Sequence, residues 1–270
     1  MLEHIRFHDT RLAGIDAMSA TSARTFPRHT HDQYGMGVVD SGGHASLSDR
    51  RQVEAGPGSL IFVNPGEVHD GRAIGGRPRS WRILYFDPTV IEETWTDISD
   101  GANSSFAFTG AVFADDTLRG LFDAAFAQAT ATAGSRDAME CESAIIRLAA
   151  RAELNSTARP RESQATPCIR RARELIDADP SSAHLTLARL AEEVQLSRYQ
   201  LLRTFSRELG LTPHAYILQQ RLAMARRLIR AGNGLAETAT RAGFFDQSHL
   251  THRFAEQFGV TPHRYASMRP

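Results

Sequence analysis

Three histidines in the N-terminal half have the residue type and spacing that could bind a metal ion. His29 and His31 are separated by a single residue, and His69 follows later in the same half of the chain. Three imidazoles can hold Zn²⁺ or another divalent ion in a site that keeps one coordination position open. The sequence therefore contains one candidate metal site.

Arginine supplies the second kind of chemistry. The chain has no Lys, so all 31 of its Lys+Arg residues are arginines. Residues 168–270 contain 15 Arg and 9 Asp/Glu, a balance of +6, whereas residues 1–167 contain 16 Arg and 22 Asp/Glu, a balance of −6. Guanidinium groups make bidentate contacts with phosphate and guanine. A basic C-terminal region could use them on nucleic acid, although a GC-rich coding sequence would also favour Arg over Lys.

Composition excludes several classes of protein. The 270 residues are enough for two domains, 41% of them are hydrophobic, and no apolar run approaches the roughly 18 residues of a membrane span. The N-terminus lacks the basic and apolar regions of an export signal. Cys141 and Cys168 have no C-x-x-C spacing, which argues against a zinc finger or a disulfide framework. We therefore expect a cytoplasmic protein with no membrane partner.

The C-terminal region repeats one pattern without a gap. Six residue types recur 49 positions apart, in the pairs Phe205/Phe254, Gly210/Gly259, Thr212/Thr261, Pro213/Pro262, His214/His263 and Tyr216/Tyr265. Two copies are too few for a solenoid, so the repeat indicates a duplicated binding module. Each histidine of the pair follows Thr-Pro at a predicted helix start, which favours a helix-end role over metal binding.

The elements that must position these residues differ along the chain. Residues 1–110 contain short apolar segments, such as 59–63 and 81–86, between turns rich in Gly, Pro and Asp, a pattern typical of a sandwich or small barrel. Residues 117–155 have helical periodicity broken at Gly134-Ser135, which predicts a helical hairpin. Such a hairpin could pack on the barrel or form a dimer interface.

All segments after residue 168 have the pattern of helices. The first copy of the repeat predicts helices at 187–194 and 198–209, and the second copy places its second helix at 247–258. Ser197 and Asp246 are suitable N-caps for these second helices. A helix, a tight turn and a second helix is the geometry that enters a DNA major groove about 12 Å wide.

The second copy resembles the signature of the AraC/XylS family of bacterial transcription regulators. The matching residues are Ala239-x3-Gly243-Phe244-x-Asp246-Gln247-Ser248-His249-Leu250-x2-Arg253-Phe254-x4-Gly259-x-Thr261-Pro262-x2-Tyr265. The first copy matches the upstream half of the family pattern, and the resemblance covers roughly residues 168 to 267. It implies that the helix at 213–231 holds two DNA-reading heads about one DNA turn apart.

This resemblance also implies which side chains meet DNA. On the first reading helix they are Arg198, Tyr199, Leu202 and Arg203, and on the second Gln247, Ser248, His249, His252 and Arg253. Arg203 could fork onto guanine, and Gln247 could read adenine or bind phosphate. Leu202 and His252 stand where longer polar residues are common. We expect the first helix to carry more base-specific affinity and the second mainly positioning.

The N-terminal half resembles cupin domains. Gly58-x5-Asn64-Pro65-Gly66-Glu67-Val68-His69 is similar to the second cupin motif, with Asn64 in place of the usual Pro. The first cupin motif has a Glu four or five residues after its second His, and this chain has Gly35 and Met36 there. The carboxylate of a typical cupin enzyme site is therefore missing.

The same half also resembles the ligand-binding cupin of many AraC-type regulators. The segments that carry this resemblance are Arg28-His29-Thr30-His31-Asp32-Gln33-Tyr34 and Pro65-Gly66-Glu67-Val68-His69-Asp70. Such domains commonly sense small metabolites without metal. Aromatic walls with a few polar groups suit small polar ligands, so the expected effector-binding residues are His29, His31, Tyr34, His69, Trp81 and Tyr85. Metal binding by His29, His31 and His69 stays as the alternative.

The sequence thus predicts an α+β multidomain protein. Its predicted parts are a cupin-like effector-binding β-barrel at 1–110, a helical hairpin for dimerisation at 111–155, a linker at 156–167, and an all-α DNA-binding domain with two helix-turn-helix motifs at 168–270. We expect a homodimeric, sequence-specific activator that binds double-stranded DNA, a small polar metabolite and RNA polymerase.

No catalysis and no cofactor are expected of such a regulator, apart from the divalent metal of the alternative site. Two other interpretations stay open. One is a cupin oxygenase or isomerase, or a metal-binding sensor, joined to a DNA-binding module. The other is a constitutive regulator whose barrel only dimerises.

Overall fold

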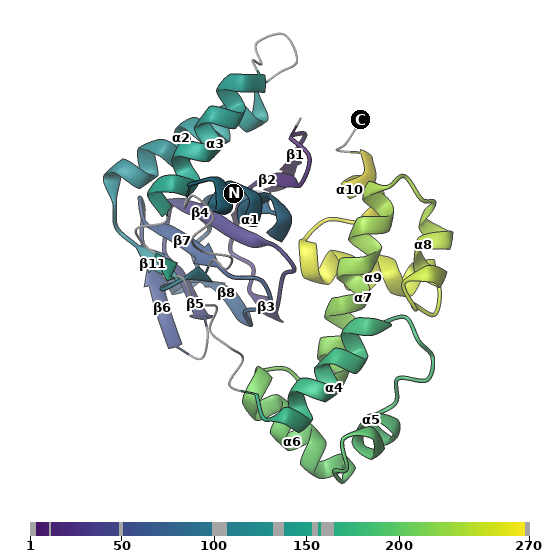
Figure 1. Cartoon of the computed structure of the whole chain (residues 1–270). Coiled ribbons are helices and arrows are strands. Elements are labelled where there is room, and N and C mark those ends of the chain that lie inside the picture. Colours follow the sequence, from purple (N-terminus) through teal and green to yellow (C-terminus); the bar gives the residue numbers. More distant parts are fainter. Residues whose placement is uncertain are drawn as a thin grey trace. The chain divides into compact units, whose positions relative to one another are not determined.

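The computed structural model describes residues 4–10, 12–48, 51–98, 107–131, 138–152, 156–157 and 165–267. The chain divides into two compact units, an N-terminal unit of residues 1–161 and a C-terminal unit of residues 162–269 (Figure 1). Strands dominate the first unit and the second is helical. Among the described residues, no helix has the length and hydropathy needed to cross a membrane.

A six-stranded sheet is the larger layer of the N-terminal unit, with strands in the order β1-β2-β9-β4-β7-β11. Its strands are β1 (His4–His8), β2 (Ile15–Ser22), β9 (Arg79–Phe86), β4 (Tyr34–Ser41), β7 (Leu60–Val63) and β11 (Val112–Phe113). The central strand β9 pairs antiparallel with β2 on one side and β4 on the other. Because side chains alternate along a strand, each strand presents one set of residues to each face.

A four-stranded sheet forms the second layer, in the order β3-β8-β5-β6. Its strands are β3 (Phe26–His29), β8 (His69–Ala73), β5 (His44–Ser48) and β6 (Arg51–Ala55). Phe26 contacts Trp81 of the large sheet, and Arg79 reaches His44, so the two sheets face each other. Backbone pairing among the described strands keeps these two layers as separate sheets, so the predicted cupin-like barrel is a two-layer sandwich without closure.

Helices cover the outer face of the large sheet. They are α1 (Pro88–Ile98), α2 (Asp116–Thr130) and α3 (Ala138–Ala152). A short 3-10 turn, η1 (Ile74–Gly76), follows β8. Phe122 of α2 packs with Met36 and Leu84 in the main apolar core. The hairpin α2–α3 agrees with the predicted one, whereas α1 falls in a region expected to hold only strands and turns. Ile91 and Trp95 of α1, four residues apart, are buried in this core.

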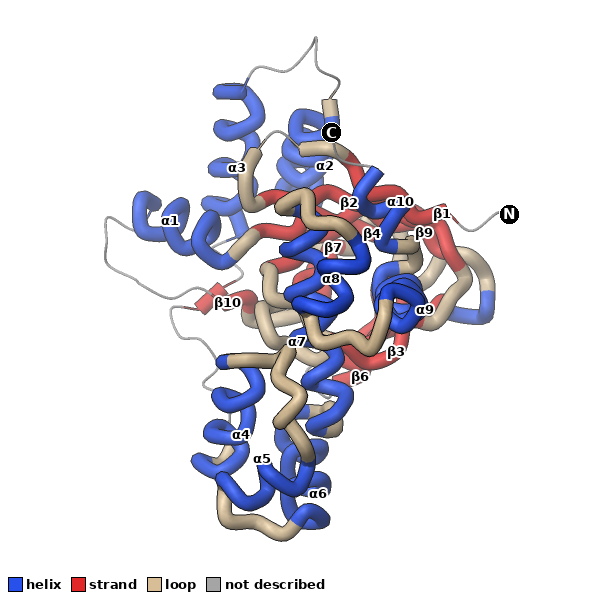
Figure 2. The backbone as a smooth tube through the Cα atoms, turned by 90° about the vertical axis from the view of Figure 1, so that its right-hand side faces the viewer, coloured by secondary structure: helices blue, strands red, loops and turns tan. Residues whose placement is uncertain are grey.

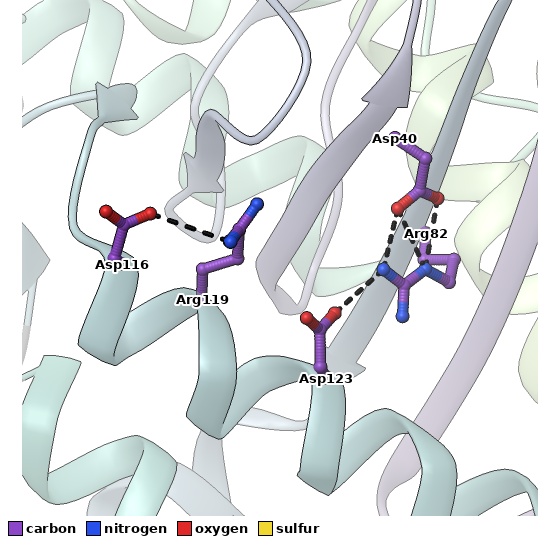
Figure 3. A network of polar contacts seen from close by, with 5 residues as sticks. All are labelled: Asp40, Arg82, Asp116, Arg119 and Asp123. Carbon is purple, nitrogen blue, oxygen red and sulfur yellow. Dashed lines mark hydrogen bonds and ion pairs between the residues drawn. The ribbon is translucent and has the colours of Figure 1, made fainter.

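Arg82 connects the hairpin to the sheet (Figure 3). This residue of β9 faces the helices, and its guanidinium contacts the carboxylate of Asp40 on β4 at 2.6 Å and that of Asp123 on α2 at 2.8 Å. A second ion pair, between Arg151 and Asp115 at 2.7 Å, ties α3 to the N-cap of α2. The hairpin is therefore held to β9 by packing and by charge.

The predicted linker at 156–167 is partly structured. β12 (Ser156–Thr157) pairs antiparallel with β10 (Ala107–Phe108), and Pro167 is the first residue of α4. Pro at this position suits a helix start because its missing N–H would have no intrahelical acceptor. Residues 158–164 of the predicted linker lie outside the described residues.

The C-terminal unit is built around the long helix α7. Its helices are α4 (Pro167–Ala178), α5 (Leu187–Glu193), α6 (Arg198–Leu209), α7 (Pro213–Arg230), α8 (Leu235–Arg241), α9 (Gln247–Phe258) and α10 (Pro262–Ser267). Figure 2 shows α4, α5 and α6 grouped at one end of α7 and α8, α9 and α10 at the other.

The repeated residues take equivalent places in the two copies. Gly210 and Gly259 end α6 and α9 in the left-handed conformation, with φ of 76° and 71°. That conformation suits glycine because it has no Cβ to clash. The rings of Phe205 and Tyr216 lie 5.7 Å apart, and those of Phe254 and Tyr265 lie 5.4 Å apart. The 49-residue repeat is therefore a repeat in space as well.

Candidate functional site

The three candidate histidines meet between the two sheets. His29 on β3 and His69 on β8 are directly paired across the strands, with ring centroids 4.3 Å apart. The His31 ring lies 4.9 Å from His29 and 5.1 Å from His69. One ligand atom from each histidine lies within 4.8 Å of the other two. The sequence prediction that these residues converge therefore agrees with the geometry.

Backbone carbonyls fix the protonation of two of these rings. Nδ1 of His29 lies 2.7 Å from the carbonyl oxygen of Pro27, and Nδ1 of His69 lies 3.1 Å from that of Glu67. A carbonyl oxygen only accepts, so Nδ1 carries the proton in each ring. Burial lowers the pKa of His29 to about 3 and that of His69 to about 4, which keeps both rings neutral. Each ring therefore offers the lone pair of Nε2 as an acceptor.

This arrangement fits a metal ion in its donor set. Histidines that bind metal usually donate their second ring N–H to a carbonyl or carboxylate, as His29 and His69 do. Within the described part of the chain, no cysteine or carboxylate joins the three histidines in one potential ligand group. The three nitrogens could hold a divalent ion with open coordination positions, and they could equally accept hydrogen bonds from a hydroxylated ligand.

The other three predicted effector residues separate in the structure. Tyr85 lies beside the cluster, with its ring 5.1 Å from His31. Trp81 shares that face of β9 and contacts Phe26. Tyr34, in contrast, contacts Phe108 within the apolar core on the helix side of the sheet. The structure therefore does not place Tyr34 with the histidines, because its strand position turns it to the opposite face.

Sequence reasoning missed two polar residues of the same interior, Arg79 and His44. Arg79 is 1% exposed, and its Nε donates to Nδ1 of His44 at 2.9 Å. Its Nη1 donates to the carbonyl oxygens of Ser22 at 3.3 Å and Arg24 at 3.1 Å. Burial lowers the pKa of Arg79 to about 10 and that of His44 to about 4. The available signal was alternation along β9, which puts Arg79 on the same face as Tyr85.

The first reading head consists of α5 and α6. Ser197 and Gln200 form a reciprocal capping box at the start of α6, in which each side chain accepts from the other's backbone N–H. Leu201 and Phe205 are fully buried. The four predicted DNA-contacting residues are all exposed, namely Arg198, Tyr199, Leu202 and Arg203.

The second reading head consists of α8 and α9, and only part of its predicted set is exposed. Gln247, Ser248 and His252 are exposed, while His249 and Arg253 are half-buried. Nδ1 of His249 accepts from the backbone N–H of Phe245 at 3.4 Å, and Arg253 pairs with Glu256 at 2.9 Å. His249 and Arg253 thus have contacts within the domain. The second head therefore has fewer exposed polar side chains available for DNA than the sequence predicted.

Phe245 is a surface residue that sequence reasoning missed. Its side chain is 92% exposed, next to Asp246, the N-cap of α9. The preceding residue, Phe244, is 5% exposed. The signal was two consecutive phenylalanines before a helix cap, since only one of them can enter the local core. An exposed aromatic at the start of a reading helix is suited to contact with a sugar or a thymine methyl group.

Helix α7 determines the spacing of the two heads. Its 18 residues span about 27 Å. The Tyr216 hydroxyl donates to Asp177 of α4 at 2.8 Å, and Arg221 donates to the carbonyl of Pro180 at 2.7 Å. The loop that follows α4 also meets the second head, because a Cβ on Gly243 would lie 2.8 Å from Ser181. Both heads are thus fixed to one scaffold.

The fold and the two sites define a regulator with a ligand-binding domain and a helix-turn-helix DNA-binding domain. The family model described as AraC-like ligand binding domain matches residues 12–149, and a helix-turn-helix domain model matches residues 190–268. The first match covers more than half of the chain. The chain belongs to the AraC family of transcription regulators, and it is a regulator rather than an enzyme, as its relatives are by name.

Two curated relatives match along most of their length. The HTH-type transcriptional regulator YbfI of Bacillus subtilis (strain 168) is 25% identical over 255 residues, which cover 92% of this chain and 86% of that protein. The arabinose operon regulatory protein of Escherichia coli (strain K12) is 26% identical over 236 residues, which cover 86% of this chain and 77% of that protein.

Solved structures of ToxT from Vibrio cholerae share the fold. One has a TM-score of 0.57 at 11% identity and covers 94% of this chain and 98% of that chain. Another, with bound unsaturated fatty acid, has a TM-score of 0.56 at 14% identity and covers 94% of each chain. At this identity the likeness concerns the fold alone.

Proposed function

We propose that this regulator is controlled by a small polar molecule bound between the two sheets of the N-terminal unit. The observation that carries the proposal is the convergence of His29, His31, His69 and Tyr85 in the interior of a domain whose family is ligand-binding. Apolar walls with a few convergent polar groups are the usual form of a small-molecule site. Tyr34 is excluded from the proposed set because it faces the helices.

The route from ligand to DNA runs through the large sheet and its hairpin. Strand β9 carries Tyr85 and Trp81 on the interior face and Arg82 on the helix face, where Arg82 binds Asp123 of α2. A ligand that changes the position of β9 changes the support of the hairpin. An effector can shift an equilibrium only by its difference in affinity for the two states. The expected output is a change in which half-sites the protein occupies.

The hairpin is also the proposed dimer contact. Met139 and Ile146, seven residues apart on α3, are 72% and 42% exposed. Apolar residues at this spacing lie on one side of a helix and favour helix pairing. A homodimer would bring two pairs of reading heads to paired half-sites. We propose that it acts in the bacterial cytoplasm and activates transcription by contact with RNA polymerase.

Arg203 is the proposed base-reading residue of the first head, where Arg198 and Tyr199 add phosphate or sugar contacts. Gln247, Ser248 and Phe245 take the matching roles at the start of α9. The exposed residues of α6 include three arginines, Arg198, Arg203 and Arg207, whereas those of α9 include none with a fixed charge. This difference supports a first head with more base-specific affinity.

A footprint on operator DNA, repeated with a panel of small polar metabolites, tests the function. We expect at least one compound to change the protected half-sites at concentrations that also raise the melting temperature of the N-terminal unit. Protection that no compound in the panel changes would favour a constitutive regulator whose sandwich only supports the dimer.

A metal-responsive regulator is the second candidate, favoured by the spacing of the three histidine nitrogens. Metal analysis of the full chain, purified without a histidine tag, separates it from the first. Stoichiometric metal in the wild type that is lost in His69→Ala would support the metal sensor. Wild-type protein free of metal, and unchanged in DNA binding when Zn²⁺ is added, would leave only the metal-free site.

A further inference from the structure

Arg79 is a buried cation with one unused donor group. Among the residues that the structure describes, it is the largest fully buried side chain, and its Nη2 has no hydrogen-bond partner within them. The groups that it contacts in the described part of the chain are two carbonyl oxygens, the His44 ring, and the faces of Trp81 and Phe26. None of these groups carries negative charge. A buried charge is costly unless it is paired, so this guanidinium lacks the partner that its position requires.

The unused donor points over the interior face of β8. A Cβ on Gly71 would lie 3.4 Å from Nη2 of Arg79 and 3.3 Å from the His44 ring. His69 precedes Gly71 by two residues and so lies on the same face, about 7 Å away along the strand. Because Gly71 has no side chain, Nη2 of Arg79 faces the interior side of β8 between Gly71 and His69, which we call the strip.

The two ends of this strip have complementary demands. Arg79 offers a charged donor, which pairs best with a carboxylate. His29 and His69 offer neutral acceptors, because their Nδ1 protons are used on carbonyl oxygens. Acceptors of this kind pair with hydroxyl groups. An unsubstituted aliphatic acid would leave the imidazoles unpaired, and a neutral sugar would leave the guanidinium unpaired.

We propose that the effector is a hydroxylated carboxylic acid, with its carboxylate on Nη2 of Arg79 over Gly71 and its hydroxyls donating to Nε2 of His29 and His69. The inference rests on the proposed function and names the chemical class of its ligand. Trp81 supplies a flat apolar wall, because it stacks on the same guanidinium at 4.8 Å. Both ends of the ligand are then satisfied by groups that the protein alone leaves open.

Calorimetric titration of the full-length protein with matched probes tests the class. The probes are threonate and gluconate as hydroxy acids, glucose as the neutral counterpart, and hexanoate as an acid without hydroxyls. We expect a hydroxy acid to bind at least about tenfold more tightly than glucose, since truncating one partner of a buried charge pair typically costs more than that factor. It should also bind about tenfold more tightly than hexanoate, which leaves the buried imidazole acceptors without donors.

Three variants assign the binding to the strip. Arg79→Met removes the guanidinium but keeps an unbranched apolar side chain, and it should abolish the preference for acid over glucose. Gly71→Ala keeps the charge, fills the space under Nη2, and should weaken acid binding about tenfold. Arg72→Met removes the same charge from the exposed neighbour on β8 and should leave affinity unchanged. If Arg79→Met does not fold, Gly71→Ala and Arg72→Met alone decide the question.

Several results would overturn the inference. They are equal binding of gluconate and glucose, acid binding that is unaffected by Gly71→Ala or by a folded Arg79→Met, and the failure of both hydroxy acids to bind. If a neutral compound changes the operator footprint while the acids do not, the acid class is wrong and effector control stands. If nothing changes the footprint although the acids bind, the proposed function fails instead.

Discussion

The two units use the same residue types in opposite ways. In the N-terminal unit, Arg79 is 1% exposed and His29 is 8% exposed, and both lie in the interior between the sheets. In the C-terminal unit, Arg203 and His252 are exposed on helices that have buried faces of Leu and Phe. The free-energy cost of desolvation explains the difference, because a charged group or an imidazole is buried only where another polar group can pair with it.

The difference in burial indicates which kind of molecule each polar group can bind. Interior polar groups can serve only a ligand that enters the sandwich, whereas exposed groups on a rigid helix can serve a large surface such as DNA. The same contrast distinguishes the two heads. The first has three exposed arginines on α6, whereas in the second Arg253 and His249 make contacts within the domain.

Low pH should have the largest effect, because it should unfold the N-terminal unit before the C-terminal unit. In the folded state the pKa of His29 is about 3 and those of His44 and His69 are about 4. An unfolded histidine binds its proton near pH 6.5, so the unfolded chain takes up protons first as pH falls, and stability decreases between about pH 6.5 and 4. Each unit by which the pKa is lowered corresponds to about 1.4 kcal/mol, so full protonation of the three histidines would cost several kcal/mol in total.

Both tryptophans, Trp81 and Trp95, lie in the N-terminal unit, so their fluorescence in urea titrations at stepped pH reports on that unit. His44 accepts from Arg79, so protonation of its Nδ1 would also place two cations together. A free energy of unfolding, measured by tryptophan fluorescence, that stays constant from pH 7 to about pH 4.5 would contradict the conclusion that the buried histidines are neutral in the folded state.

Gly243→Ala should have the next largest effect, confined to the C-terminal unit. Gly243 has φ of 77°, and an added Cβ would lie 2.8 Å from backbone atoms of Ser181. We expect a loss of roughly 2–3 kcal/mol in the stability of the C-terminal unit, measured by helix circular dichroism, together with weaker operator binding. Gly234→Ala is the matched control, because a Cβ there meets nothing within 4 Å. Equal effects of the two changes would contradict the close contact.

Arg203→Ala should reduce base-specific operator binding more than a change in the second head does. Loss of a bidentate base contact costs about 1–3 kcal/mol and relaxes preference at one base pair. Gln247→Ala should cost less, and Arg171→Ala, on α4 outside both heads, controls for charge. Binding measured across a set of single-base operator variants gives the readout. A uniform loss over all variants would assign Arg203 to phosphate instead.

Ile146→Glu should have the smallest direct effect on each unit and act on assembly. A charge on the exposed side of α3 opposes helix pairing without entering the core. We expect the dimer dissociation constant to rise at least about tenfold in sedimentation experiments, since about 1.4 kcal/mol corresponds to that factor. Glu140→Gln, an exposed position on the same helix away from the Met139–Ile146 face, should leave it unchanged. A dimer insensitive to Ile146→Glu would place the interface elsewhere.

The DNA-binding unit was the more predictable part because its signals are local. Caps, the left-handed glycines and the repeated Phe and Tyr each act within a few residues, and the structure has them at Ser197, Asp246, Gly210 and Gly259. The burial of individual side chains could not be predicted at the same level of detail. Phe244 and Phe245 are adjacent and alike in sequence, yet only the first is buried.

The N-terminal unit was harder because its site depends on pairing between distant strands. The histidines were identifiable by type, but Arg79 meets His44 only through contact between two sheets. Residues 34–38 alternate large side chains with glycine, but both faces of this strand are buried, so the alternation did not indicate that the face with Tyr34 is the one toward the helices. Helix α1 was missed because it is short and directly follows a strand and Pro88, although Ile91, Trp95 and Ile98 have helical spacing.

The most direct test of the account is operator occupancy as a function of effector in the wild type and in His69→Gln. We predict that His69→Gln binds effector-free operator with wild-type affinity, because the residues proposed to contact DNA lie in the other unit, and that its occupancy no longer responds to the effector. A variant that responds as the wild type does would contradict a ligand site built on the buried histidines.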